Sequence, residues 1–530
     1  MSTINPKVAK KIKLRKVKAK GNTKKTTKTE DTKRAKGSGV AVNNRPSIKM
    51  NPGDHSTIVD GVERILIRTD VQFFQRSGEL VRPVSVKVPA AHGAKTTAIH
   101  LREVNSVFAR DMMSRHIDFL RYDARAADWM PSVAPLAIAA TMIERKAEWK
   151  FRNIIGVIST PTVKPDGSLL TTEGHDAATD LLLVNPPRMP PIPDKPTRAD
   201  ATVSLARLKD LFAEFPYVDG VSRSVALSGA ISAVARGAFL NAPMHACSAT
   251  DAGSGKSYQN DVIAMIAIGD KMPVMSTGAN EEETEKRLAS AMIAGQSLIS
   301  LDNISIPLKG DSLCQLIERP VVKVRILDQS KQVQVDTRGT LVFCTGNQLS
   351  LVGDICRRTL LSSLDPKLEQ PELRQFRANP IAKVQADRGR YVADCLIIVR
   401  AYFVAGRPNP APKLASFETW SDSVRSALIW LGEADPVDSM EATRAEDPER
   451  IDLGSIMLAW VSEFGIGEEH RTTIASVVDA AMKMGINPTT GFKTDPENAE
   501  LNAACLAACE AMNGKRGYRC EVFGTLAARS

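Results

Sequence analysis

The sequence lacks several features by which common classes of protein are recognised. It contains no run of 18 apolar residues, so we expect no membrane-spanning helix. Its N-terminus is basic but has no apolar segment, which argues against a secretory signal peptide. The eight cysteines are scattered, several of them in apolar stretches, which is typical of reduced thiols. These absences predict a cytoplasmic protein with no membrane partner.

The cysteines do not form the cluster that a structural zinc ion needs. Cys505 and Cys509 share one face of an expected helix, but no histidine and no second cysteine pair accompanies them. Structural zinc sites use four such ligands. We therefore interpret both cysteines as part of a hydrophobic core.

The positive charge of the chain is concentrated in its first 50 residues. They hold 16 Lys and Arg against two acidic residues, a balance of +14, whereas the rest of the chain has a balance of −4. With almost no large apolar side chain, this segment cannot bury enough surface to offset the entropy of ordering. We expect residues 1–50 to be a disordered tail that binds DNA or RNA by releasing counterions. A tail that only keeps the protein in solution is the alternative.

One short stretch, residues 249–257, carries the strongest functional signal. It reads Ala-Thr-Asp-Ala-Gly-Ser-Gly-Lys-Ser and matches the phosphate-binding pattern G-x-x-x-x-G-K-[ST], except that Thr250 replaces the first glycine. We expect residues 243–248 to form a buried strand before it and residues 256–268 a helix after it. Glycines in such a loop let backbone N–H groups approach phosphate, and the helix N-terminus favours negative charge.

This loop predicts binding of ATP with Mg²⁺. Lys256 is expected to neutralise charge on the β- and γ-phosphates, and the Ser257 hydroxyl to ligate Mg²⁺. The expected nucleotide-binding residues are Gly253, Ser254, Gly255, Lys256 and Ser257. A glycine- and serine-rich loop with a surface lysine is the alternative interpretation.

A strand downstream of the loop is expected to bring an acidic residue to the same site. Residues 297–301 read as a buried strand that leads into Asp302, which would hold Mg²⁺ from the side opposite the loop. The next residue is Asn303, where many ATPases have a glutamate that polarises water. The water-positioning residue is therefore unassigned, with Glu283 and Glu285 as candidates.

A third strand, residues 339–347, ends in a residue that suits a sensor role. Asn347 at its tip is expected to sense the γ-phosphate and to orient water, and a turn-forming Gly-Asn is the alternative. Arg357 and Arg358 follow after a short loop. We expect one of them, with a preference for Arg358, to reach the nucleotide of a neighbouring subunit as a trans-acting finger. A pair of surface arginines is the alternative.

Alternating apolar and polar residues predict a β-hairpin between the acidic residue and the sensor, over residues 321–327 and 331–336. Lys323, Arg325 and Lys331 would lie on its solvated face and tip. In a ring-shaped ATPase, such a hairpin would point into the central channel and grip DNA phosphates. An ordinary exposed hairpin is the alternative.

The predicted fold class is α/β, with a P-loop ATPase core on a parallel sheet. In the part before this core, residues 61–67, 71–74 and 84–88 are expected strands. Thr197 is expected to cap a helix that has Asp200 in its first turn. The expected segments are a disordered basic tail (1–50), an α+β module (51–195), the core with a helical lead-in (196–365), a helical lid region (366–435) and a C-terminal helical module (436–530).

The order of these motifs resembles that of the superfamily 3 helicases, a branch of the AAA+ ATPases encoded by small viruses, phages and plasmids. More closely, the chain is similar to the helicase-like ATPase part of primase–helicase proteins in phages, plasmids and integrative elements, over roughly residues 150–435. The segments that carry the similarity are residues 166–170, 211–218, 242–244, 253–257, 285–288, 301–303, 345–347, 353–354, 417–420 and 430–432.

This resemblance implies a P-loop (AAA+-like) ATPase core and, over residues 436–530, a module similar to an incomplete winged helix. It further implies a hexameric ring that hydrolyses ATP and translocates on single-stranded or forked DNA during replication of a mobile element. It implies nucleotide and Mg²⁺ binding by Lys256 and Ser257, Mg²⁺ binding by Asp302, a sensor role for Asn347 and a channel contact by Lys331. The sequence shows no zinc-binding cluster or acidic triad of a primase, so primer synthesis would need a separate chain. Two other functions stay open: an ATP-switched DNA-binding protein without processive unwinding, and a P-loop phosphotransferase.

Overall fold

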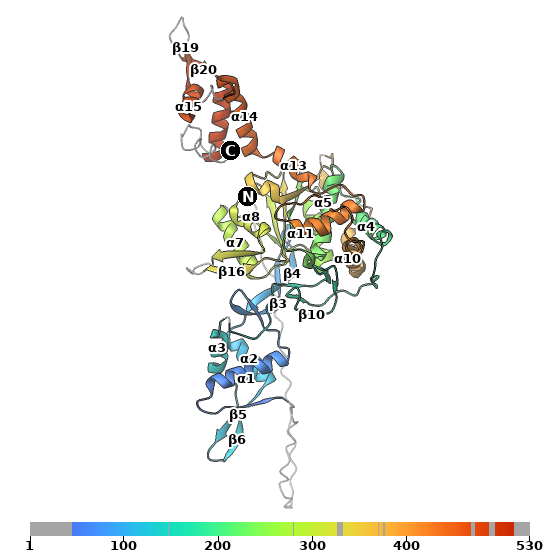
Figure 1. Ribbon diagram of the computed structural model, residues 1–530, viewed down its shortest axis with the longest axis vertical. Coiled ribbons are helices and arrows are strands. Elements are labelled where there is room, and N and C mark those ends of the chain that lie inside the picture. Colours follow the sequence, from blue (N-terminus) through green and yellow to red (C-terminus); the bar gives the residue numbers. More distant parts are fainter. Residues whose placement is uncertain are drawn as a thin grey trace, which may run out of the picture. The chain divides into compact units, whose positions relative to one another are not determined.

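The computed structural model describes residues 45–513, except residues 147, 279, 326–331, 369, 375–376, 468–471 and 487–492. Nearly all of the expected basic tail, residues 1–50, lies outside this part of the chain. The elements below belong to the unit Pro46–Ser530, the larger of the two into which the chain divides (Figure 1). None of the described helices is long and apolar enough to cross a membrane.

Residues 46–144 contain two small three-stranded sheets and three α-helices. The strand orders are β1-β5-β6 and β2-β3-β4. The bounds are β1 Ser47–Lys49, α1 His55–Arg68, β2 Phe74–Arg76, β3 Glu79–Pro89, β4 Lys95–Glu103, α2 Ser106–His116, β5 Asp118–Asp123, β6 Asp128–Ser132 and α3 Leu136–Glu144. Short strands follow: β7 Gly156–Ile158, β8 Thr162–Val163, β9 Leu169–Leu170, β10 Gly174–Asp176 and β11 Leu181–Leu183. The expected strand over residues 84–88 lies within β3, whereas that over residues 71–74 reaches β2 only at Phe74.

The expected strand over residues 61–67 is wrong, because this segment lies within α1. Its aliphatic and β-branched residues favour a strand when they are considered alone. However, Ile58, Val62 and Leu66 are spaced as one face of a helix, and all three are buried. Packing of this face against α2 and α3 outweighs the local preference.

A five-stranded sheet with helices packed on it forms the centre of the unit. Its order is β13-β14-β17-β12-β18, and every neighbouring pair is parallel. The strands are β12 Met244–Ala249, β13 Val274–Met275, β14 Leu298–Ile304, β17 Leu341–Asn347 and β18 Thr359–Leu364, and the helices that alternate with them are α6 Lys256–Ile268, α7 Glu281–Ile293 and α8 Asp311–Glu318. The prediction of a mixed α/β fold with a parallel sheet is confirmed.

The sheet brings the functional candidates to one edge. The inner strands β12, β14 and β17 consist almost entirely of buried residues, as expected of strands covered on both faces. Parallel strands have their carboxyl ends at the same edge of the sheet, where ligands of such folds bind. The residues that follow these three strands therefore lie close together.

Helices α4 Arg198–Phe212, α5 Gly220–Val234 and α10 Arg388–Val404 pack against one another (Figure 1). The start of α4 is fixed by the expected cap: the Thr197 hydroxyl accepts the Asp200 N–H at 3.3 Å, and Asp200 Oδ2 accepts the Thr197 N–H at 2.8 Å. This reciprocal arrangement satisfies two backbone donors that a helix start leaves open. The cap prediction is confirmed.

The C-terminal elements form a small core of their own. This core is formed by α14 Pro448–Phe464, α15 Ile474–Met482 and α16 Ala499–Asn513, and the strands β19 Met484–Ile486 and β20 Lys493–Pro496 lie between α15 and α16 in the sequence. Buried residues of the preceding elements belong instead to the central core; these elements are α9 Pro380–Ala386, α11 Glu418–Trp420, the π-helical turn Ser421–Arg425, α12 Ser426–Trp430 and α13 Asp438–Ala445. Residues of α14, α15 and α16 pack together, and Cys505 is fully buried among them. Among the described residues, no group of histidine, cysteine and carboxylate side chains is arranged to hold a metal.

Candidate nucleotide-binding site

The glycine-rich loop, residues 249–257, joins the end of β12 to the start of α6. Gly253 and Gly255 have φ values of 77° and 102°, in the left-handed region that favours glycine. Gly255 is also the N-cap of α6, which begins at Lys256, so the loop turns directly into the helix. The N–H groups of the first helical turn have no partner within the helix, which makes this end suited to an anion.

Lys256 lies in the loop, beside the tip of a neighbouring strand. It is 9% exposed, and its Nζ donates to the Asp251 carbonyl at 2.9 Å and to Asn347 Oδ1 at 2.6 Å. Burial lowers the pKa of Lys256. Because β12 and β17 pair in register from His245 to Ala249, the sheet itself places Asn347 opposite the start of the loop.

Asp302 meets the first turn of α6 from β14. Its Oδ1 accepts the Ser257 hydroxyl at 3.0 Å and the Thr345 hydroxyl at 2.6 Å. A hydroxyl and a carboxylate on facing elements are oxygen ligands of the kind that Mg²⁺ takes, with waters filling its other positions. The donor set of Ser257 and Asp302 therefore fits the predicted cation.

Thr345 is a site residue that the sequence analysis did not assign. It holds Asp302 through its hydroxyl, and the same oxygen accepts the Asn303 N–H at 3.0 Å. A hydroxyl residue within an otherwise apolar buried strand is the signal that points to such a role. The side chain of Asn303 is exposed, at the end of β14.

The two glutamates considered for water positioning lie at the start of α7. Glu283 forms an ion pair with Arg287 one helical turn further on. Glu285 is exposed. Neither position by itself assigns the role, which stays a prediction.

A pocket of about 470 Å³ opens beside the loop at the carboxyl edge of the sheet. It is lined by residues from the ends of β12, β17 and β18, among them Thr250, Gln348 and Asp365, and by Thr443 of α13. The pocket thus adjoins the loop on the side where parallel α/β sheets bind their ligands.

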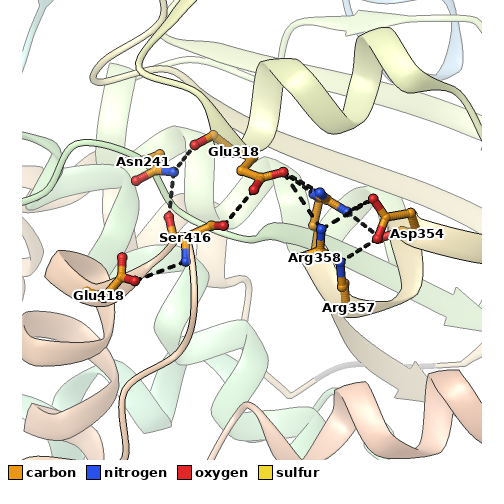
Figure 2. A network of polar contacts seen from close by, with 7 residues as sticks. All are labelled: Asn241, Glu318, Asp354, Arg357, Arg358, Ser416 and Glu418. Carbon is orange, nitrogen blue, oxygen red and sulfur yellow. Dashed lines mark hydrogen bonds and ion pairs between the residues drawn. The ribbon is translucent and has the colours of Figure 1, made fainter.

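Arg357 and Arg358 end a 3₁₀ turn, Gly353–Arg358, and their surroundings differ (Figure 2). The Arg358 side chain is 5% exposed and lies between the carboxylates of Glu318 and Asp354. The Arg357 side chain is 40% exposed and pairs with Asp354. The hydrogen bond from Arg357 and the nearby Arg358 charge hold the pKa of Asp354 below its ordinary value.

The expected hairpin is present as the antiparallel strands β15 Val321–Arg325 and β16 Gln332–Asp336. Val322, Val324 and the valines of β16 are buried, whereas Lys323 and Arg325 are exposed on the opposite face. The alternation is therefore as predicted. Lys331 lies outside the described residues.

The fold and this site define a mixed α/β protein with a glycine-rich loop at the carboxyl edge of a parallel sheet. No protein-family model and no curated protein matches the chain. Among solved structures, the apo NrS-1 C-terminal region is similar at 10% identity over 86% of this chain and 90% of that chain, with a TM-score of 0.35. SCCmec type IV Cch, described as an active helicase, is similar at 11% identity over 74% and 82%, with a TM-score of 0.32. At these values, neither likeness identifies the function of this chain.

Proposed function

We propose that this chain is an ATP-dependent DNA helicase or translocase of a mobile genetic element, which acts in DNA replication as an oligomeric ring. The observation that carries the proposal is the meeting of Lys256, Ser257, Asp302 and Asn347 at the ends of three neighbouring parallel strands. A lysine and a hydroxyl on a glycine-rich loop, an acidic residue and a polar sensor are the parts from which ATPase sites are built.

Each residue of this group has a role in the proposal. Lys256 and the N–H groups of residues 253–257 hold the phosphates of ATP, in place of the contact that Lys256 makes with Asn347. Ser257 and Asp302 hold the Mg²⁺ that accompanies ATP and neutralises phosphate charge. Asn347 is then free to contact the γ-phosphate and to orient water.

Arg357 is the better candidate for the trans-acting finger. A finger must leave its own subunit, and the Arg357 side chain is 40% exposed, whereas that of Arg358 is 5% exposed. Both arginines are near the carboxylates of Asp354 and Glu318, but Arg357 is 4.0 Å from Glu318, whereas Arg358 is hydrogen-bonded to it. We assign Arg358 to holding the turn. A finger acting in trans requires a second subunit, which the proposed ring would provide, with a hexamer as the expected size.

DNA binding is assigned to the hairpin and to the basic tail. Lys323 and Arg325 present two cations on the exposed face of β15, and Lys331 remains a predicted contact. The N-terminal 50 residues add a polycation whose affinity for phosphates does not depend on sequence. The proposed partners are single-stranded or forked DNA and a separate primase.

ATP hydrolysis with and without single-stranded DNA tests the proposal. We expect the wild type to hydrolyse ATP faster when DNA is present and Lys256→Ala to lose nearly all hydrolysis. Lys413→Ala, which removes an exposed lysine elsewhere, is the matched control and should behave as the wild type. Arg357→Ala should lower kcat by about 10³-fold or more in the assembled protein, as for other trans-acting arginines.

Each contrary result favours a different function. Nucleotide-dependent DNA binding without hydrolysis would favour an ATP-switched DNA-binding protein. The presence of Asn303, where many ATPases have a glutamate that polarises water, agrees with this alternative. A rate of ATP hydrolysis that is the same with and without DNA would favour a phosphotransferase.

Mixing Lys256→Ala and Arg357→Ala chains should restore part of the activity, since some interfaces then combine an intact loop with an intact finger. No restoration would count against a shared site.

A further inference from the structure

Glu318 joins segments that lie far apart in the sequence (Figure 2). It is the last residue of α8 and lies three residues before β15 begins. Its side chain contacts Arg358 of the 3₁₀ turn and Ser416 of the loop before α11. Its carbonyl accepts the side-chain amide of Asn241, just before β12. Glu318 therefore sits where the hairpin, the arginine pair and the central sheet meet.

Both carboxylate oxygens of Glu318 are engaged. Oε2 accepts Arg358 Nε at 2.8 Å and also its Nη2, and Oε1 accepts the Ser416 hydroxyl at 2.6 Å. Asn241 contacts both Glu318 and Ser416, since its Nδ2 also donates to the Ser416 carbonyl at 2.7 Å. The Ser416 hydrogen bond and the Arg358 charge hold the pKa of Glu318 below its ordinary value, so the carboxylate is ionised at neutral pH.

The arginine pair is oriented through Glu318. Arg358 Nη1 donates to the Asp354 carbonyl at 2.8 Å, and Arg358 also pairs with the Asp354 carboxylate. Asp354 in turn accepts Arg357 Nη2 at 3.3 Å. Arg357 and Arg358 thus share Asp354, and Glu318 supplies the second carboxylate that balances their two charges. Glu318 Oε2 also lies 4.0 Å from Arg357 Nη2, so Glu318 is in ion-pair distance of both arginines.

The base of the hairpin is attached to the two residues that follow Glu318. Thr337, which comes directly after β16, donates its hydroxyl to the Arg319 carbonyl at 2.5 Å and its N–H to the Pro320 carbonyl at 2.9 Å. Thr337 is 5% exposed, and Pro320 has a fixed φ, so this joint is stiff. These hydrogen bonds connect the base of the hairpin to the two residues that directly follow Glu318.

We propose that Glu318 is a positioning residue that couples the hairpin to the arginine pair. A DNA strand held by Lys323 and Arg325 would shift the base of the hairpin, and through Glu318 would change how Arg357 faces the neighbouring subunit. This inference rests on the proposed function and adds to it the route by which DNA regulates hydrolysis. Because contacts alone do not establish coupling, the test measures the coupling itself.

The test compares kcat and KM for ATP with and without single-stranded DNA in the full chain. In Glu318→Gln we expect the DNA stimulation of kcat to fall by at least about fivefold, the lower end for coupled sites. KM should stay within about twofold, because the loop that binds ATP is unaltered. Glu418→Gln is the matched control: Glu418 belongs to the same network but contacts only the Ser416 N–H, at 3.2 Å, and should retain full stimulation.

A second variant separates coupling from a loss of structure. Thr337→Val cuts the side-chain link between the hairpin and Arg319 but leaves Glu318 and both arginines intact, so it should also lower DNA stimulation. Glu318→Asp keeps the charge and should recover part of what Glu318→Gln loses. An unchanged stimulation ratio in Glu318→Gln or Thr337→Val, even with a lower kcat, would overturn the inference while leaving the proposed function standing. A wild type without ATP hydrolysis would instead overturn the proposed function first.

Discussion

Asn303 occupies a backbone conformation that few side chains adopt readily. Its φ is 57°, in the left-handed region, at the point where the register between β14 and β17 shifts after Leu301. Its N–H donates to Thr345 Oγ1 at 3.0 Å, which helps to fix this conformation. Asparagine enters the left-handed region more readily than other residues that have a side chain. The backbone thus gives a physical reason for asparagine directly after Asp302.

We expect Asn303→Glu to lower the free energy of unfolding by about 1 kcal/mol, because glutamate is strained at this φ. Asn303→Gly is the control and should stay within about 0.5 kcal/mol of the wild type, since glycine adopts this φ without strain. Chemical denaturation measures both changes. A glutamate variant as stable as the wild type would contradict the strain that we assign to this position.

At the scale of the elements, the local sequence best predicts the bounds of the helices and strands around the glycine-rich loop. Helix α6 has the expected bounds, because Gly255 and Gly269 adopt left-handed conformations at its two ends. Residues 61–67 were expected to form a strand but lie within α1. The helical spacing of the apolar residues becomes visible only when the residues on both sides of this segment, starting at Ile58, are included.

The contacts of Glu318 could not be predicted from the sequence. Glu318 lies 40 residues from Arg358 and 98 residues from Ser416, and no periodicity relates positions so far apart. The difference in exposure between the Arg357 and Arg358 side chains, on which we base their different roles, arises from the same tertiary contacts. Motif order predicts which residues gather at the sheet edge, whereas only the packed structure distinguishes neighbours within a motif.

Helices α4 and α10 are joined by an ion pair with one buried partner. Arg207 Nε donates to Asp394 Oδ2 at 2.9 Å, and its Nη2 donates to Oδ1. The side chain of Asp394 is 1% exposed, and that of Arg207 is 37% exposed. The hydrogen bond to Asp394 raises the pKa of Arg207. The carboxylate thus depends on Arg207 for its balancing charge.

We expect Arg207→Ala to lower the free energy of unfolding by about 3 kcal/mol, because the Asp394 carboxylate stays buried without its cation. The control is Arg115→Ala, which removes an exposed pair with Asp111 within α2 and should cost less than about 1 kcal/mol. Denaturant unfolding of both variants is the measurement. Equal, small losses would show that the buried pair contributes no more than the exposed one.

At the scale of the whole molecule, the two parts of the chain differ in the sign of their charge. Residues 1–50 have a balance of +14, and the remainder has a balance of −4. In the proposed function, long-range attraction to DNA would therefore come from the N-terminal residues, while local cations such as Lys323 and Arg325 would act only at close range. The salt dependence of DNA binding separates the two contributions.

We expect removal of residues 1–44, which hold 14 Lys and Arg, to make the dependence of DNA affinity on salt shallower. For single-stranded DNA, the slope of log K against log salt falls by about 0.7 for each phosphate that the protein no longer neutralises. Fluorescence anisotropy with labelled single-stranded DNA at several salt concentrations measures this slope, and ATP affinity should be unchanged. The double variant Lys323→Ala and Arg325→Ala serves as the control, since it removes only two cations and should change the slope by no more than about 1.4. A truncated chain with the slope of the wild type would assign the N-terminal residues to the solubilising alternative and would leave DNA binding to the hairpin.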